Sequence, residues 1–308
     1  MIRIDCHCDT ALWLLKQPSL LELPQAQQDL RRICRYLDVC FMGIFVNEAE
    51  HPQNTPQIFQ QVLQLLRSDI AKHNDMVMPL LYREQLQQPL SPKLLLIGAE
   101  GAAGLGEDCE FLEQYYQAGL RLIGPTWNNA NRYAGGCASD QGLSKEGKRL
   151  VRLCNERGIL LDGAHLNRRS FWQMLELSEQ PIIVSHTCCA ALQPHQRNLN
   201  DSQLIALAKR GGVAGITFVP DFLGGAGDLP RLCEHIEHAV SLIGSEHVAL
   251  GSDFDGCDPV TELGDLSKLP LLYQTLRERG MKEKDLDNLA GASVLKLLQK
   301  VLPVSFFE

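Results

Sequence analysis

Residues 159–186, ILLDGAHLNRRSFWQMLELSEQPIIVSH, contain two short apolar runs with an amphipathic segment between them. The runs at 159–163 and 181–185 predict buried strands, and the spacing of apolar residues over 168–178 predicts a helix. A strand–helix–strand unit is the usual connection between parallel strands. A histidine follows or ends each run, so the unit predicts His165 and His186 on neighbouring strands, at the same end of a sheet.

The same alternation continues along the chain and predicts the fold. Further strands are predicted at 1–5, 40–46, 93–99, 120–125, 212–219 and 247–252, and further helices at 55–72, 107–118, 144–157, 201–210, 229–244, 265–279 and 283–301. Roughly eight strand–helix units favour an α/β fold, a (β/α)₈ barrel of the TIM type. An open doubly wound sheet is the alternative, although no G-x-G-x-x-G motif follows the first strand. Without a visible linker, 1–308 is predicted to be a single domain.

Composition excludes several classes of partner. The chain has 308 residues, a net charge of −8 and no run of lysine and arginine, which disfavours nucleic acid and anionic membranes as partners. No apolar run reaches the ~18 residues of a membrane span. The amino terminus enters a strand and leaves no room for a leader peptide, and the eleven cysteines lack zinc-finger spacing. We therefore expect reduced thiols and a cytoplasmic location.

Five residues that can bind metal lie at the ends of predicted strands: His7, Asp9, Glu100, His165 and His186. Active sites of α/β barrels are built at the carboxyl ends of the strands. His7 and Asp9 are two apart on an extended chain and can point to the same side. Imidazole nitrogen and carboxylate oxygen together suit zinc. Each residue alone has a structural explanation, but the set predicts a two-metal hydrolase.

Two further residues are candidates for substrate chemistry. Asp253, in the sequence GSDFDG (251–256), follows the last predicted strand and can transfer a proton, although Asp-Gly pairs are also common in turns. Arg197 can bind a carboxylate through two parallel hydrogen bonds, or can be a solvated loop residue.

Taken together, these segments resemble the renal (membrane) dipeptidase family of zinc metallopeptidases, including its bacterial members. The resemblance covers nearly the whole chain, and it rests on residues 5–10, 98–101, 118–121, 162–165, 181–186, 196–201 and 251–256.

The resemblance implies a role for each candidate. His7 and Asp9 would hold one zinc ion, His165 and His186 a second, and Glu100 would bridge them and share in catalysis. Arg197 would bind the free carboxylate of a small dipeptide, and Asp253 would handle the proton. A water or hydroxide between the two Zn²⁺ ions would attack the peptide carbonyl.

Two departures from the family pattern concern the site. Trp127 stands where the family has a histidine that stabilises the tetrahedral intermediate, and loss of one such donor costs about 2.7–4 kcal/mol. The indole N–H, Asn128 or Asn129 could replace that donor. Cys6 and Cys8 flank His7, and alternation predicts that both face away from His7 and Asp9 as small buried side chains.

Three functions remain open on this basis. The first is a zinc dipeptidase, with Trp127 at the substrate. The second is a two-metal hydrolase of another carboxylate-bearing amide or ester. The third is a catalytically impaired relative, for which Trp127 is the supporting feature. A homodimer is possible, but no sequence feature indicates it.

Overall fold

The computed structural model describes residues 1–87 and 89–305, and its centre is a sheet of parallel strands. The strand order is β6-β5-β4-β2-β1-β9-β8-β7, and β3 pairs with β4 outside this path. The strands are β1 (Ile4–Cys8), β2 (Val39–Phe45), β3 (Val77–Pro79), β4 (Lys93–Glu100), β5 (Leu120–Gly124), β6 (Leu160–Leu161), β7 (Ile183–Thr187), β8 (Val213–Ile216) and β9 (Val248–Leu250). A bridge between Asp162 and Ile183 joins the two ends of the path, so the eight strands form a nearly closed barrel.

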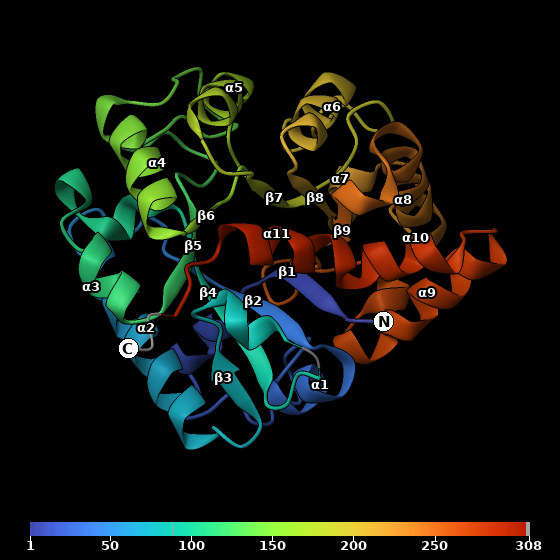
Figure 1. The fold of residues 1–308 in the computed structure, drawn as a ribbon, viewed down its shortest axis with the longest axis horizontal. Coiled ribbons are helices and arrows are strands. Elements are labelled where there is room, and N and C mark those ends of the chain that lie inside the picture. The colour runs from blue at the N-terminus through green and yellow to red at the C-terminus, as the bar shows by residue number, and fades with distance from the viewer. Residues whose placement is uncertain (88, 306–308) are drawn as a thin grey trace.

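Helices surround this ring of strands (Figure 1). They are α1 (Leu30–Tyr36), α2 (Thr55–Lys72), α3 (Leu112–Gln117), α4 (Lys145–Arg157), α5 (Arg168–Leu177), α6 (Asp201–Lys209), α7 (Pro220–Leu223), α8 (Leu229–Ile243), α9 (Leu269–Glu278), α10 (Glu283–Asp287) and α11 (Ser293–Val301). The predicted (β/α)₈ barrel is therefore confirmed.

The apolar core has an inner and an outer layer. The inner cluster includes Ile4, Phe41 and Leu96 from the strands together with Val294 and Leu297 of α11. The outer cluster fills the space between the strands and the surrounding helices. Figure 1 shows α11 crossing the middle of the ring, where these contacts close the amino-terminal end of the barrel. The carboxyl ends of the strands are left to carry polar side chains.

The first strand differs from its predicted form. It runs to Cys8 instead of ending at residue 5, and its register with β2 shifts between Asp5 and Cys8. Alternation predicted that Cys6 and Cys8 both face away from His7 and Asp9, but Cys6 belongs to the inner cluster and Cys8 to the outer one, so the two do not share one face of the strand. A register shift of this kind breaks strict alternation, which is why the simple pattern failed. Both thiols are fully buried, as expected.

The helices also differ from prediction in detail. The predicted helix 283–301 is interrupted between α10 and α11, where the backbone of Gly291 is non-helical with a φ of 164°. A Cβ at this position would lie 2.7 Å from Ile4 Cγ1, which favours glycine there. Helix α6 is capped by Asn200, whose side chain accepts a hydrogen bond from Gln203 N. The short elements α1, β3 and α7 were not predicted.

No helix in the described part of the chain has the length and apolar character needed to cross a membrane. All eleven cysteines lie within the described residues, and each is a free thiol.

Candidate metal centre

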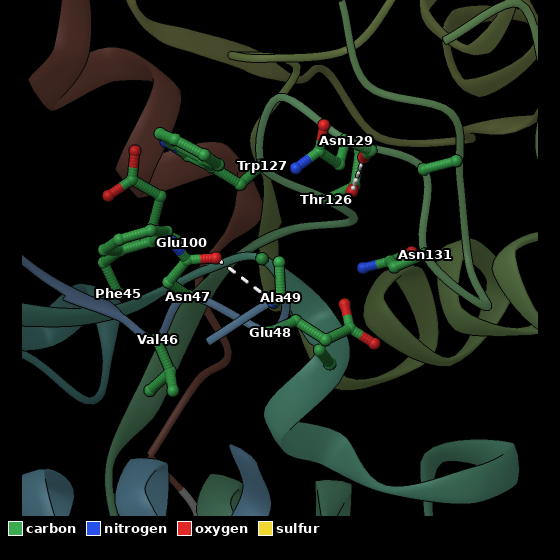
Figure 2. Close-up of a pocket in the computed structure, with 13 residues that line it drawn as sticks. Phe45, Val46, Asn47, Glu48, Ala49, Glu100, Thr126, Trp127, Asn129 and Asn131 are labelled. Carbon is green, nitrogen blue, oxygen red and sulfur yellow. Dashed lines mark hydrogen bonds between the residues drawn. The ribbon is translucent and has the colours of Figure 1, made fainter. Parts of the chain in front are cut away.

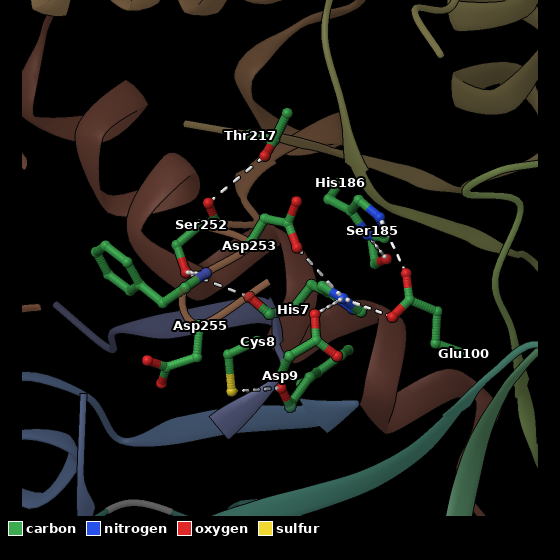
Figure 3. A network of polar contacts seen from close by, with 12 residues as sticks. His7, Cys8, Asp9, Glu100, Ser185, His186, Thr217, Ser252, Asp253 and Asp255 are labelled. Atoms are coloured by element: carbon green, nitrogen blue, oxygen red, sulfur yellow. Dashed lines mark hydrogen bonds and ion pairs between the residues drawn. The ribbon is translucent and has the colours of Figure 1, made fainter. Parts of the chain in front are cut away.

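The five predicted metal ligands meet at the carboxyl end of the barrel. His7 and His186 lie within β1 and β7, Glu100 ends β4, and Asp9 and His165 follow β1 and β6. Strands distant in the sequence are brought together by closure of the ring. Figure 3 shows His7, Asp9, Glu100 and His186 turned toward one another.

Glu100 forms one group with two histidines. Its Oε1 atom lies 2.6 Å from His165 Nε2 and 3.6 Å from His186 Nε2. Ligand atoms of these three residues all lie within 4.8 Å of one another, which is close enough to surround a single ion. The group has two nitrogens and a carboxylate, a donor set that zinc favours.

Glu100 also forms a second group with His7 and Asp9. Its other oxygen, Oε2, lies 3.4 Å from His7 Nε2, and Asp9 Oδ2 lies 3.6 Å from the same nitrogen. These ligand atoms likewise lie within 4.8 Å of one another. The two groups therefore share Glu100, with one carboxylate oxygen directed to each.

Hydrogen bonds on the far side of the first group define its protonation. His165 Nδ1 lies 2.8 Å from Asn128 Oδ1, an acceptor, so this nitrogen carries the proton. Ser185 Oγ donates its one proton to Asp162 Oδ2 and accepts from His186 Nδ1 at 2.8 Å. Both Nε2 atoms therefore present lone pairs, and they lie 2.8 Å apart. Such opposed lone pairs fit a bound cation.

Burial keeps these two rings neutral. It lowers the pKa of His165 to about 3, with the Arg197 charge adding to the effect. Burial likewise holds the pKa of His186 well below its usual value, with His7 and Arg197 contributing. A neutral imidazole is the form that binds metal.

The second group concentrates negative charge around His7. Its Nε2 atom has Asp9, Glu100 and Asp253 oxygens at 3.4 to 3.7 Å. Burial raises the pKa of Asp253 to about 8, and the nearby carboxylates of Asp9 and Glu100 add to the effect, while His7 opposes it. His7 Nε2 and Asp9 Oδ1 are buried without a hydrogen-bond partner. Crowded carboxylates and unpaired ligand atoms also fit a divalent cation.

Two functional candidates lie in strained backbone. His165 and Asp253 have φ values of 68° and 64°, in the left-handed region. This conformation costs an L-residue roughly 1–2 kcal/mol, although histidine and aspartate adopt it more often than most residues. In both cases the turn follows a barrel strand and directs the side chain to the centre. Strain of this kind is common at functional sites.

Arg197 and Trp127 lie beside the predicted ligands. Arg197 Nη2 is 3.1 Å from His165 Nε2, and its Nε atom is buried without a partner. The Trp127 ring packs 4.9 Å from Phe45 and 5.9 Å from His165, measured between ring centroids. Both residues line a cavity of about 350 Å³, together with Asp9, Glu100, Asn128, His165, Phe222 and Asp253. This volume is in the range of small-molecule sites.

The structure narrows the choice of donor that could replace the family histidine. Asn128 Oδ1 accepts from His165 Nδ1, which leaves the Asn128 Nδ2 group as a donor, while Asn129 lines a neighbouring cavity and not the one that contains Asp253. The Trp127 indole forms no hydrogen bond with another described residue. Of the three residues considered, Trp127 and Asn128 therefore keep a donor and line the cavity that contains Asp253.

Two aspartate–serine pairs that sequence reasoning missed support the site. Ser252 donates from N and Oγ to the two oxygens of Asp5 at 2.9 and 2.5 Å. Ser185 donates to Asp162 at the same two distances. One aspartate–serine pair joins β1 to the loop after β9, and the other joins the end of β6 to β7. At both junctions few backbone hydrogen bonds connect the neighbouring strands. Each serine directly precedes a candidate residue, His186 or Asp253, a signal visible in the sequence.

An α/β barrel with histidines and carboxylates gathered at the carboxyl ends of its strands is typical of metal-dependent barrel enzymes. A sequence profile described as membrane dipeptidase, peptidase family M19, matches residues 1–305. The chain belongs to this family of metallo-dipeptidases.

Individual relatives agree with this membership. An uncharacterized protein in the pqqA 5′ region of Klebsiella pneumoniae is 34% identical over 266 residues, which cover 81% of this chain and 98% of that protein. Dipeptidase verJ of Clonostachys rogersoniana is 34% identical over 216 residues, which cover 68% of this chain and 56% of that protein. The match therefore spans about half the length of the fungal dipeptidase.

Solved structures share the fold. A dipeptidase of metallopeptidase family M19 superposes with a TM-score of 0.90 at 25% identity, over 98% of this chain and 99% of that chain. A metallopeptidase from Rhodobacter sphaeroides, bound to a phosphinate mimic of L-Ala-D-Ala, superposes with the same TM-score at 24% identity and the same coverage.

Proposed function

We propose that this chain is a dipeptidase with two zinc ions. His165 and His186 would hold one ion, His7 and Asp9 the other, and Glu100 would bridge them. The observation that carries the proposal is the pair of three-residue ligand groups that share Glu100. Residues 1–308 would act as one domain, since the ligands come from β1, β4, β6 and β7, which belong to a single ring of strands that β8 and β9 complete.

The position of Arg197 supports a short substrate with a free carboxylate. Its guanidinium lies beside His165, 6% of the residue is exposed, and Nε lacks a partner. In a dipeptide the terminal carboxylate lies one residue from the scissile carbonyl. Arg197 could therefore bind the carboxylate while the carbonyl lies at the metal ligands. Bidentate pairing with arginine would fix the orientation. The dipeptide mimic bound by the Rhodobacter sphaeroides relative agrees with a substrate of this size.

The residues around the ligands suit peptide hydrolysis. Divalent ions bound there would polarise the peptide carbonyl and lower the pKa of the attacking water. Asp253 Oδ1, 3.7 Å from His7 Nε2, lies where it could take a proton from that water and deliver it to the leaving amine. Trp127 could donate its indole N–H to the carbonyl oxygen. These groups would therefore act together on one peptide bond: on its carbonyl oxygen, on the attacking water and on the leaving amine.

Zinc content and dipeptide hydrolysis test the proposal. Purified protein should carry about two equivalents of zinc. Zinc-loaded protein should cleave members of a panel of L,L- and L,D-dipeptides, and Asp253→Asn should not. Metal content near zero in protein never exposed to chelator would overturn the metal centre. Metal-replete protein that cleaves no dipeptide would favour the second candidate, another carboxylate-bearing amide or ester, to which Trp127 also points.

A further inference from the structure

A second cavity adjoins the one that contains the candidate ligands. It measures about 170 Å³ and is lined by the loop after β2, the residues that follow β4 and the loop after β5. Phe45, Glu100 and Trp127 line both cavities and therefore form a shared wall. Figure 2 shows these three residues grouped at one end, with Glu48 and Asn131 at the other. The side cavity thus leads from the candidate metal centre to a polar end.

Glu48 is the free charged group at that end. The residue is half-buried, and no hydrogen bond or ion pair joins its carboxylate to another described residue. Burial raises the pKa of Glu48, and Arg132 only partly offsets this. Arg132 is itself paired with Glu107 and Glu146 at 3.2 and 3.7 Å. Glu48 therefore lacks a cation of its own.

The amides of Asn47 and Asn131 make their hydrogen bonds to other groups and not to Glu48. Asn47 donates to Glu50 and accepts from Ala49 N. Asn131 donates to Pro125 O and accepts from the backbone of residues 133 and 134. A ligand that enters the side cavity would meet Glu48 as its main charged partner.

The barrel order places this cavity opposite the carboxylate-binding arginine. Arg197 lies on the loop after β7, and Glu48 on the loop after β2. In the ring, β6, β5 and β4 separate these two strands on one side, and β8, β9 and β1 on the other. A dipeptide whose carboxylate is held by Arg197, and whose peptide bond lies at Glu100, therefore directs its amino-terminal residue toward Glu48.

We propose that the side cavity binds the cationic side chain of the amino-terminal residue, so that lysyl and similar dipeptides are preferred substrates. This inference rests on the proposed dipeptidase function. The substrate α-ammonium is only two bonds from the scissile carbonyl and stays beside the ligands, so it does not compete for Glu48. A volume of about 170 Å³ equals that of about six waters, which matches the five heavy atoms of a lysine side chain. Trp127, held in the shared wall by packing alone, positions that side chain.

The test compares lysyl-alanine with norleucyl-alanine, which has an uncharged side chain of similar length. Zinc-loaded wild-type protein should show a kcat/KM ratio of about tenfold or more in favour of the lysyl substrate. Glu48→Gln should bring the ratio close to one and leave norleucyl-alanine hydrolysis unchanged. Glu107→Gln is the matched control, because it removes an exposed charge that also faces Arg132, and it should keep the preference. No preference in the wild type, or a preference that survives Glu48→Gln, would overturn the inference.

A binding measurement separates this inference from the proposed function. Calorimetry with phosphinate mimics of the same two dipeptides needs no turnover. Preferential binding of the lysyl mimic that is lost in Glu48→Gln would support the side cavity even if no dipeptide is hydrolysed, in which case the dipeptidase proposal alone fails. Equal binding of the two mimics, or no binding of either, would overturn the inference.

Discussion

Ser185→Ala should weaken metal binding, although Ser185 is not itself a metal ligand. The hydroxyl accepts a hydrogen bond from His186 Nδ1 at 2.8 Å and donates to Asp162 Oδ2 at 2.5 Å. Ser185 is fully buried, so solvent does not replace the lost contacts. In the variant, Asp162 Oδ1 keeps its hydrogen bonds from the backbone N–H groups of residues 185 and 164, but Asp162 Oδ2 loses its partner. His186 loses the acceptor that fixes its ring and its tautomer.

Two magnitudes follow from these contacts. Leaving a buried polar group without its partner costs about 1–3 kcal/mol of folding free energy. Loss of a group that orients a metal-binding histidine typically lowers metal affinity about 10- to 100-fold. That range corresponds to about 1.4–2.7 kcal/mol, similar to the stability loss. The two effects must therefore be measured separately.

Ser252→Ala is the control that separates them. Ser252 makes the same pair of bonds to Asp5, but its hydroxyl contacts no histidine side chain. Denaturant unfolding of chelated protein should show a similar stability loss in both variants. Zinc titration against a competing chelator should show a loss of affinity in Ser185→Ala alone. Equal zinc affinity in the two variants would refute the assigned role of Ser185.

Four further outcomes test the site. Glu100→Gln should release both ions, whereas Asp9→Asn should weaken the binding of only one ion. Elemental analysis counts the bound ions, and retention of one ion by Glu100→Gln would exclude a bridge. Arg197→Ala should raise KM for dipeptides about 10- to 100-fold, as expected for a lost charge-assisted pair, and an unchanged KM would remove it from substrate binding. Trp127→Phe keeps the packing against Phe45 and should lower kcat about a hundredfold if the indole N–H is the donor, as we expect. Chelation should lower the thermal unfolding midpoint, because ions that bind only the folded state stabilise it; an identical midpoint would argue against tight binding.

The spacing of apolar residues along the chain was enough to predict the fold class, the bounds of one long helix and several strand ends. Helix α2 begins and ends where its apolar spacing predicted, because a helical face is written into neighbouring residues. The positions of Glu100, His165 and His186 at strand ends were equally visible, since a polar residue interrupts each apolar run. The fold class followed from the order of such elements along the chain.

The register shift in β1 could not be predicted from the spacing of apolar residues. Alternation assumes an unbroken strand, and the irregularity between Asp5 and Cys8 depends on how β1 pairs with β2. The place of Asn128 was also hidden. It was considered only as a donor to substrate through its nitrogen, whereas the structure shows that its oxygen orients His165.

The sequence by itself determined which residues end the strands and which chemistry they can perform. Only the tertiary structure decided their partners: that the two Glu100 oxygens face different ligand groups, that Ser185 links Asp162 to His186, and that Glu48 lies across the ring from Arg197. The physical reason is that periodicity reports the face of one element. Contacts across a barrel arise only when the ring closes and brings distant strand ends together.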